Sequence, residues 1–188
     1  MLSHYIEIKI LPDPEFSESM LMGALLNKLH RALIELNTTD IGVAWPEYQL
    51  KPKSLGGRLR IHSSAAQLDM LMGLSWLKGM SDHTQCSDIT EIPKQVGYLN
   101  FNRKQYKTNA DRLRRRRMKR KGESYEEALA HIPVSIERKS DLPFVGLRSQ
   151  STGQSFQLFI NRSDVVSEPQ VGQFNSYGLS PDATVPWF

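Results

Sequence analysis

The feature that most constrains this chain is a run of basic residues at 109–121, which reads NADRLRRRRMKRK. Leucine, methionine, arginine and lysine all favour a helix, and Asn109 or Asp111 can cap its start. Only Leu113 and Met118 are available for packing, so the helix lacks a continuous apolar stripe. At about 100° per residue, five cations share one face: Arg112, Arg115, Arg116, Lys119 and Arg120.

The sequence of this helix allows two interpretations. Like charges three and four residues apart cost roughly a few tenths of a kcal/mol per pair, which an anionic partner would offset. A solvated charged face or a disordered basic tail is the simpler alternative. The run is internal and almost purely arginine, whose planar fork suits phosphate groups and guanine edges. Nucleic acid is therefore the favoured partner.

The charge of the whole chain supports the same partner. Residues 1–95 carry 9 lysines and arginines against 11 acidic residues, whereas residues 96–188 carry 15 against 9. We therefore expect the nucleic-acid surface mainly in the second half. The single cysteine, Cys86, excludes an internal disulfide, so a reducing cytoplasm is expected. No apolar run approaches the roughly 20 residues that span a bilayer, so no membrane partner is expected.

The first half alternates strand and helix patterns. We expect a strand at 4–10, a helix at 18–36 that is capped by Ser17 and carries a stripe of leucines, and strands at 41–45 and 58–62. A helix capped by Ser63 or Ser64 then runs to residue 74, and a further strand lies within 85–93. This order is that of the split ferredoxin-like arrangement. We therefore predict an α+β fold in which residues 1–95 form a ferredoxin-like domain.

The second half, residues 96–188, is predicted to be an RNA-binding domain with the arginine-rich helix and antiparallel strands. An extended segment at 98–106 leads into the basic helix, and a short helix follows from 124 to 131. Segments 144–149 and 155–161 form a hairpin in which Gly153 supplies the turn. We also expect a strand at 173–179 and a packed aromatic terminus at 185–188.

Metal and nucleotide motifs are missing from the sequence. The five histidines show no metal-ligand spacing and there is no glycine-rich phosphate loop, so neither a metal nor a cofactor is expected. Cleavage without metal is feasible on RNA, because the 2′-hydroxyl is a nucleophile within the substrate. His30 can be its base, since a histidine side chain ordinarily has a pKa near 6.5. A histidine at the apolar edge of a helix is, however, more often structural.

The other candidate residues each have an equally simple structural alternative. Ser149 and Ser151 could hold a ribose or a phosphate, but they also suit a hairpin turn. Tyr177 could position the histidine, and Phe156 could stack on a base, or both could simply pack in strands. Arg103 and Gln105 lie two apart on an extended segment, so they point the same way and could read base edges, or they could simply face solvent.

Taken together, these residues resemble the CRISPR repeat-processing endoribonucleases of the type I-F system over nearly the whole chain. The resemblance rests on ordered motifs: HYIEI at 4–8, PDPEF at 12–16, KLHRAL at 28–33, RLRIH at 58–62, DRLRRR at 111–116, LPF at 142–144, LRSQSTGQ at 147–154, YGLS at 177–180 and VPWF at 185–188.

The resemblance implies metal-independent cleavage of precursor CRISPR RNA at the 3′ base of each repeat stem-loop, and other subunits of the type I-F effector complex as partners. It implies that the catalytic residues are His30, Ser149, Ser151 and Tyr177. It also implies that Arg103 and Gln105 read bases, that Phe156 stacks, and that the five-cation face of the helix enters the major groove of the stem. Lys119 stands where arginine is expected, and Arg117 where an apolar residue is expected.

The residues alone leave two rival functions open. A non-catalytic subunit that only holds an RNA hairpin would share the arginine helix and would not need His30. A duplex-DNA binder would share the charge.

Overall fold

The computed structural model describes residues 2–106, 110–133, 140–149 and 152–188. The chain forms two compact units, one made of Met1–Lys104 with Leu142–Phe188 and the other of Gln105–Asp141. The first unit contains residues on both sides of residue 95, where the sequence predicts a domain boundary. That boundary stays a prediction.

The central sheet of the first unit is antiparallel. Its strands lie in the order β2-β5-β1-β6, and β7 also pairs with β1. The strands are β1 (His4–Ile10), β2 (Gly42–Ala44), β5 (Arg58–Ser63), β6 (Thr84–Cys86) and β7 (Thr90–Glu91). Each falls within or close to a segment that the sequence predicts as a strand.

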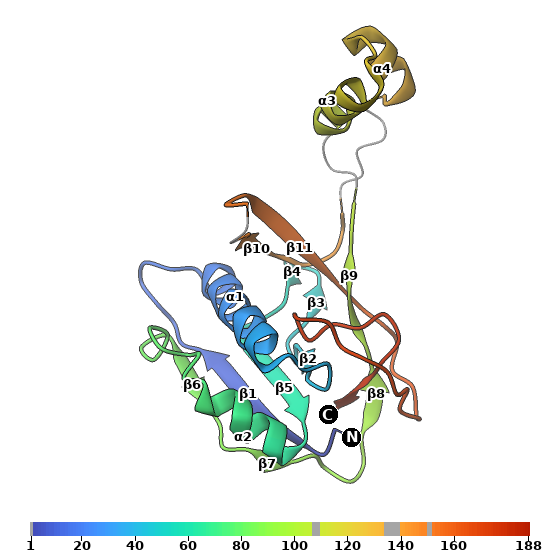
Figure 1. The fold of residues 1–188 in the computed structure, drawn as a ribbon. Coiled ribbons are helices and arrows are strands. Elements are labelled where there is room, and N and C mark those ends of the chain that lie inside the picture. Colours follow the sequence, from blue (N-terminus) through green and yellow to red (C-terminus); the bar gives the residue numbers. More distant parts are fainter. Residues whose placement is uncertain (1, 107–109, 134–139, 150–151) are drawn as a thin grey trace. The chain divides into compact units, whose positions relative to one another are not determined.

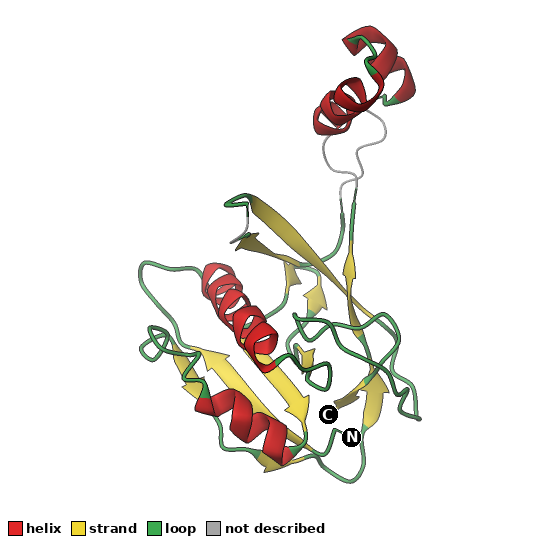
Figure 2. Cartoon of the chain, in the orientation of Figure 1, coloured by secondary structure: helices red, strands yellow, loops and turns green. Residues whose placement is uncertain are grey.

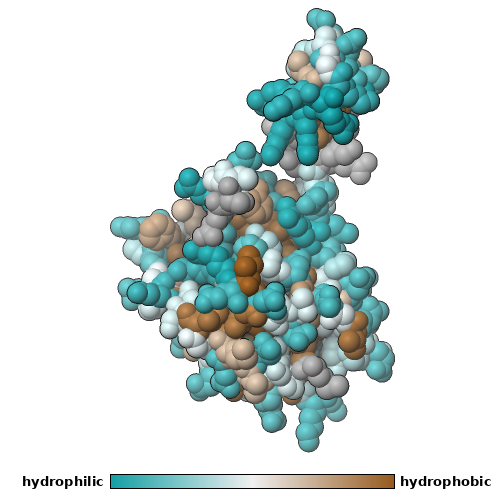
Figure 3. Space-filling model, in the orientation of Figure 1, coloured by the Kyte–Doolittle hydropathy of each residue, from teal (hydrophilic) through white to brown (hydrophobic). Residues whose placement is uncertain are grey.

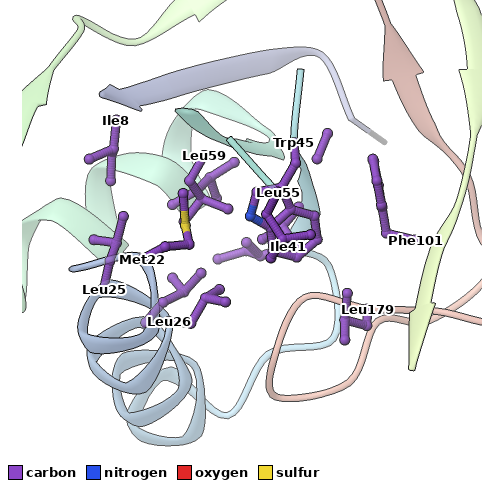
Figure 4. Packing of buried hydrophobic residues seen from close by; sticks show 14 of the residues in the cluster. Ile8, Met22, Leu25, Leu26, Ile41, Trp45, Leu55, Leu59, Phe101 and Leu179 are labelled. Carbon is purple, nitrogen blue, oxygen red and sulfur yellow. The ribbon is translucent and has the colours of Figure 1, made fainter. Parts of the chain in front are cut away.

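Two helices, α1 (Glu18–Leu36) and α2 (Ala65–Gly73), contact each other and pack on this sheet (Figures 1 and 2). The side chains of Ser17 and Ser64 cap the two helices, as the sequence predicts. Leucines at 21, 25, 29 and 33 of α1 are buried, so the predicted apolar stripe faces the core. Figure 4 shows Leu25 and Leu26 of α1 facing Ile8 and Leu59 of the sheet.

The first unit also contains smaller sheets. A three-stranded sheet has the order β10-β11-β9, formed by β10 (Phe144–Arg148), β11 (Ser155–Arg162) and β9 (Phe101–Lys104). The predicted hairpin is β10 with β11. The C-terminal strand β12 (Val185–Trp187) pairs with β8 (Gly97–Leu99), and β3 (Gln49–Leu50) pairs with β4 (Lys53–Ser54). The predicted packing of the aromatic terminus is confirmed.

Helix α1 meets strand β10 at two glycines. A Cβ added at Gly23 would lie 2.6 Å from the carbonyl oxygen of Gly146, so the backbones approach more closely than any side chain allows. This contact matters for the site because α1 carries His30 and β10 leads into Ser149.

The second unit is a pair of helices, α3 (Ala110–Lys121) and α4 (Tyr125–His131), which contact each other. Gly122 follows α3 with φ of 70°, the left-handed conformation that ends helices. Ser124 and Glu127 form a reciprocal capping box at the start of α4. Both helices were predicted from the sequence.

One predicted element is wrong. Residues 173–179 form no strand, because Asn175 turns the chain there: its side-chain oxygen accepts hydrogen bonds from the backbone N–H groups of Tyr177 and Leu179. Gly178 completes the turn with φ of 71°. The predicted α+β class with antiparallel sheets is confirmed, and none of the helices described is long and apolar enough to cross a membrane.

Candidate active site and arginine helix

The first unit contains a pocket of about 780 Å³ beside α1. Three of the four predicted catalytic residues line it, together with predicted RNA contacts. Its lining comes from α1, from the β9-β11-β10 sheet with its turn, and from the turn after Phe174: Asn27, His30, Arg31, Ile34, Arg103, Arg148, Ser149, Gly153, Phe156 and Tyr177.

His30 is held in one orientation by a backbone contact. Its Nδ1 atom lies 2.9 Å from the carbonyl oxygen of Ser176. Because a carbonyl can only accept a hydrogen bond, Nδ1 carries the proton and donates it. In the neutral ring Nε2 then keeps the lone pair, which is the form that a general base requires.

The turn at 175–178 provides that carbonyl and is itself anchored on the core. Besides the hydrogen bonds that the Asn175 side chain accepts, a backbone bond closes the turn: the Gly178 N–H donates to the Asn175 carbonyl at 2.8 Å. Val43 of β2 donates its N–H to the Gly178 carbonyl at 3.0 Å. The central sheet therefore fixes the position of Ser176 and Tyr177.

Tyr177 stacks flat against His30. The ring centroids are 3.9 Å apart and the planes differ by 3°. Burial raises the pKa of the Tyr177 hydroxyl above its ordinary value, and the nearby positive charge of Arg103 partly opposes that rise. Tyr177 therefore stays protonated at neutral pH and orients the imidazole with its ring face.

Ser149 lies at the start of the tight turn between β10 and β11. Its hydroxyl accepts a hydrogen bond from the Thr152 N–H at 3.3 Å, and its backbone pairs with Gln154 and Gly153. Gly153 has φ of 65°, which the turn requires and glycine readily adopts. Ser151, the second predicted serine, lies outside the described residues.

Two further predicted contacts, Arg103 and Phe156, meet at the sheet side of the pocket. The Arg103 guanidinium carbon lies 5.6 Å from the centroid of the Phe156 ring. Phe156 is only partly buried, so its ring lies at the edge of the core and borders the pocket. Gln105 belongs to the second unit and is exposed there.

The structure separates the cations of α3 into two groups. The five that the sequence places on one face are all exposed, and hydrophilic residues cover much of the α3–α4 unit in the view of Figure 3. Two other arginines of α3, Arg114 and Arg117, instead make contacts within the second unit. Arg114 is 3% exposed and donates to Asp111, to Tyr125 and to the Ile132 carbonyl.

Arg117 is the second of these arginines. It makes a two-pronged ion pair with Glu123, at 2.5 and 2.9 Å. This hydrogen bonding holds the pKa of the Glu123 carboxyl below its ordinary value. An arginine at this position, where the resemblance suggests an apolar residue, thus fastens the loop after α3.

Four residues that line the pocket were missed from the sequence: Asn27, Arg31, Ile34 and Arg148. Asn27 and Ile34 lie three residues before and four residues after His30, on the same face of α1, and Arg31 follows His30 directly at the side of that face. That spacing could have identified them once His30 was a candidate. Among the described residues, no group of three His, Cys, Asp or Glu side chains could hold a metal ion.

An α+β fold, a pocket lined by a histidine and a helix of exposed cations are together the features expected of an enzyme that acts on nucleic acid. The family described as CRISPR-associated protein (Cas_Csy4) matches residues 5–188. Two relatives are each called "CRISPR-associated endonuclease Cas6/Csy4", one from Escherichia coli (strain UTI89 / UPEC) and one from Pseudomonas aeruginosa (strain UCBPP-PA14). Each is 45% identical over 187 residues, covering 100% of both chains.

The chain therefore belongs to the Cas6/Csy4 family of CRISPR-associated endonucleases. The resemblance that the sequence motifs indicate is confirmed. A solved structure titled "An RAMP protein binding different RNA substrates" matches with a TM-score of 0.36 and 11% identity, covering 98% of this chain and 100% of that one. A likeness this low carries no inference.

Proposed function

We propose that this endonuclease cleaves precursor CRISPR RNA at the 3′ base of the repeat stem-loop, without a metal ion, through attack by the 2′-hydroxyl. The observation that carries the proposal is the hydrogen bond from His30 Nδ1 to the Ser176 carbonyl. It commits the other ring nitrogen, Nε2, to the role of proton acceptor in a pocket that Ser149 also lines.

The reaction begins when Nε2 of His30 removes the proton from the 2′-hydroxyl of the nucleotide before the cut. The 2′ oxygen then forms a bond to phosphorus while the bond from phosphorus to the 5′ oxygen breaks. One product ends in a 2′,3′-cyclic phosphate, which water can open to a 3′-phosphate. The other product begins with a 5′-hydroxyl once its departing oxygen takes up a proton.

Three further residues support this chemistry in the proposal. Ser149 fixes the attacking ribose, Ser151 is a second serine at the phosphate, and Tyr177 keeps the imidazole in plane. The stack on Tyr177 and the hydrogen bond to the Ser176 carbonyl both restrict the orientation of the His30 ring. Such restriction favours a near-attack geometry, which contributes strongly to rate.

RNA binding is assigned to both units. The exposed cations of α3, with Lys119 acting as a point charge, contact the phosphates of the stem. Arg103 and Gln105 read base edges at the foot of the stem, and Phe156 stacks on a base. An A-form major groove is deep and narrow, so a helix can enter it only where a duplex is short or ends. The substrate is therefore a brief stem with an open loop.

The proposal includes a division of the chain into two domains. Residues 1–95 form a ferredoxin-like domain that supplies His30, an inference supported by the strand order β2-β5-β1-β6 with one helix after β1 and one after β5. Residues 96–188 supply the RNA-binding helix and the serine hairpin. Because the cut RNA still carries its hairpin, other subunits of the type I-F effector complex are proposed partners.

The test is cleavage of a labelled repeat hairpin in EDTA. Wild type is expected to give a single cut, which is lost in His30→Ala and on placing a 2′-deoxy sugar before the cut. His131→Ala is a matched control, because His131 is an exposed histidine of α4 outside the pocket. Cleavage that requires a metal, or that persists in His30→Ala, would overturn the proposal.

A further inference from the structure

The peptide group that joins Ser176 to Tyr177, called the central peptide group below, is bound on both of its sides. Its carbonyl oxygen accepts the hydrogen bond from Nδ1 of His30 at 2.9 Å. Its N–H donates to the side-chain oxygen Oδ1 of Asn175 at 2.8 Å. Because a peptide group is planar and trans, its carbonyl and its N–H point in opposite directions and turn together. The bond to Asn175 therefore fixes the direction of the carbonyl that His30 uses.

The chain on either side of the central peptide group is held by other bonds. Before it, the Phe174 N–H donates to the Thr39 carbonyl at 2.9 Å. After it, the Gly178 carbonyl accepts the N–H of Val43 at 3.0 Å. Both are backbone bonds, so they persist when the side chain of Asn175 is removed. The path of the chain and the orientation of the central peptide group are thus held separately.

The orientation of the central peptide group decides which nitrogen of His30 carries the proton. With its carbonyl toward the ring, Nδ1 donates and Nε2 keeps the lone pair that the proposed base needs. A rotated peptide group would present the Tyr177 N–H to the ring instead. Nδ1 would then have to accept, so the proton would move to Nε2 and its lone pair would be lost.

A second feature opposes this rotation. Residues 175–178 form a turn closed by a backbone hydrogen bond, with Tyr177 as its third residue. Rotation of the peptide group in the middle of such a turn brings the third residue to positive φ. Among the described residues other than glycine, positive φ occurs at Asn37 and Ser75, so Tyr177 has negative φ. Its Cβ therefore disfavours the rotated form together with the side chain of Asn175.

We propose that Asn175 is a positioning residue for the cleavage reaction. Its side chain fixes the central peptide group, and through that group it fixes the tautomer of His30. Asn175 is exposed and does not line the pocket, so this role requires no contact with the reacting atoms. The inference rests on the proposed function, since it takes His30 as the base.

The first measurement reads the tautomer of His30 in the free protein. Long-range proton–nitrogen correlation spectra, recorded at a pH where the ring is neutral, show which ring nitrogen carries the proton. The spectrum of His30→Ala identifies the signals. Wild type is expected to carry the proton on Nδ1, whereas in Asn175→Ala part of the population should carry it on Nε2.

The second measurement is the cleavage kinetics of the repeat hairpin. Asn175→Ala is expected to lower kcat about fivefold with KM nearly unchanged, since a hydrogen bond typically changes an equilibrium by roughly that factor. Asn175→Ser should restore most of kcat and the wild-type tautomer. A serine hydroxyl accepts the same kind of backbone hydrogen bond more weakly and adds no charge beside His30.

Asp13→Ala is the matched control. The Asp13 side chain accepts hydrogen bonds from the N–H groups of Glu15 and Phe16, in a turn that does not border the pocket. It also pairs with His83, so its loss should destabilise the fold at least as much as Asn175→Ala. The tautomer of His30 and kcat should nevertheless stay at their wild-type values.

A wild-type tautomer in Asn175→Ala would overturn the inference, and so would a changed tautomer with unchanged kcat. Failure of the proposed function is read separately, from hairpin cleavage by wild type and His30→Ala, whereas the tautomer is measured without RNA. An enzyme that cleaves through His30 but keeps its tautomer in Asn175→Ala would retain the mechanism and lack this positioning residue.

Discussion

Gly23 of α1 faces the backbone of Gly146 in β10, and a Cβ on Gly23 would lie 2.6 Å from the Gly146 carbonyl oxygen. The obstructing atom belongs to the backbone of a paired strand, so it cannot turn aside as a side chain can. His30 follows Gly23 on the same helix, and Ser149 follows Gly146 at the end of the same strand. The two glycines thus set the separation of the helix and hairpin that carry the proposed base and the ribose-binding serine.

Gly23→Ala is therefore expected to push α1 and β10 apart. The free energy of unfolding should fall by about 1–3 kcal/mol, the usual cost of overpacking, and kcat for hairpin cleavage should fall at least tenfold. Denaturant unfolding and single-turnover cleavage measure the two effects.

Gly73→Ala is the control for this change, because a Cβ at that exposed glycine of α2 meets nothing within 4 Å. It should leave cleavage unchanged and raise stability by up to about 1 kcal/mol through helix propensity. Equal cleavage by Gly23→Ala and wild type would show that the close contact does not position the site.

Sequence reasoning worked where a feature depends on residues close together in the chain. The stripe of α1, the caps at Ser17 and Ser64 and the alternation of the β10–β11 hairpin are local patterns, and the structure contains them. His30, Ser149 and Tyr177 were named as candidates from residue type and family resemblance. The structure adds that they line one pocket.

Features that join distant segments could not be predicted in this way. The Gly23–Gly146 contact and the support of His30 by Ser176 depend on tertiary packing that no local pattern encodes. The predicted strand at 173–179 fails for a different, local reason: the side chain of Asn175 satisfies the backbone of a turn two and four residues further on. The pairing of Arg117 with Glu123 is also local and was not predicted.

Tyr177 is expected to act through its ring rather than its hydroxyl. The ring stacks on His30 at 3.9 Å, and burial raises the pKa of the Tyr177 hydroxyl above its ordinary value. Tyr177→Phe should keep most of the cleavage rate, whereas Tyr177→Leu should lower kcat about tenfold with little change in KM. A rate loss in Tyr177→Phe as large as in Tyr177→Leu would instead assign a direct role to the hydroxyl.

Arg115 and Arg116 lie on the exposed face of α3 and should contribute phosphate contacts. Arg115→Ala and Arg116→Ala are each expected to weaken hairpin binding and to lower the salt slope by about one for each lost contact. Binding measured at several salt concentrations gives the slope. Unchanged affinity in both variants would mean that this face is only solvated.

Arg117 provides the contrasting variant on the same helix, since its guanidinium is held by Glu123. Arg117→Met should leave the salt slope close to the wild-type value and loosen the connection between α3 and α4. Faster amide hydrogen exchange at Ala128 and Ile132, whose N–H groups bond within α4, would report that loosening. A salt slope reduced as much as in Arg115→Ala would show that Arg117 also contacts RNA.

His62 is expected to make the stability of the fold sensitive to acid. The side chain is fully buried in β5 beside Tyr5 and Phe188, and neither ring nitrogen has a hydrogen-bond partner among the described residues. Burial, with a smaller effect from the neighbouring Arg60 charge, lowers the pKa of His62 to about 3. In the unfolded chain a histidine has a pKa near 6.5.

The unfolded state therefore binds a proton that the folded state refuses between these two pKa values. The stability contributed by the neutral ring is fully present above about pH 6.5 and is lost as the pH falls toward 3, at up to about 1.4 kcal/mol per pH unit. His62→Phe should remove that part of the slope in unfolding experiments between pH 6.5 and 4.5, while His131→Asn, at an exposed histidine, should keep the wild-type slope. A slope in His62→Phe as steep as in wild type would mean that other groups cause the acid sensitivity, because a buried phenyl ring has no proton to gain.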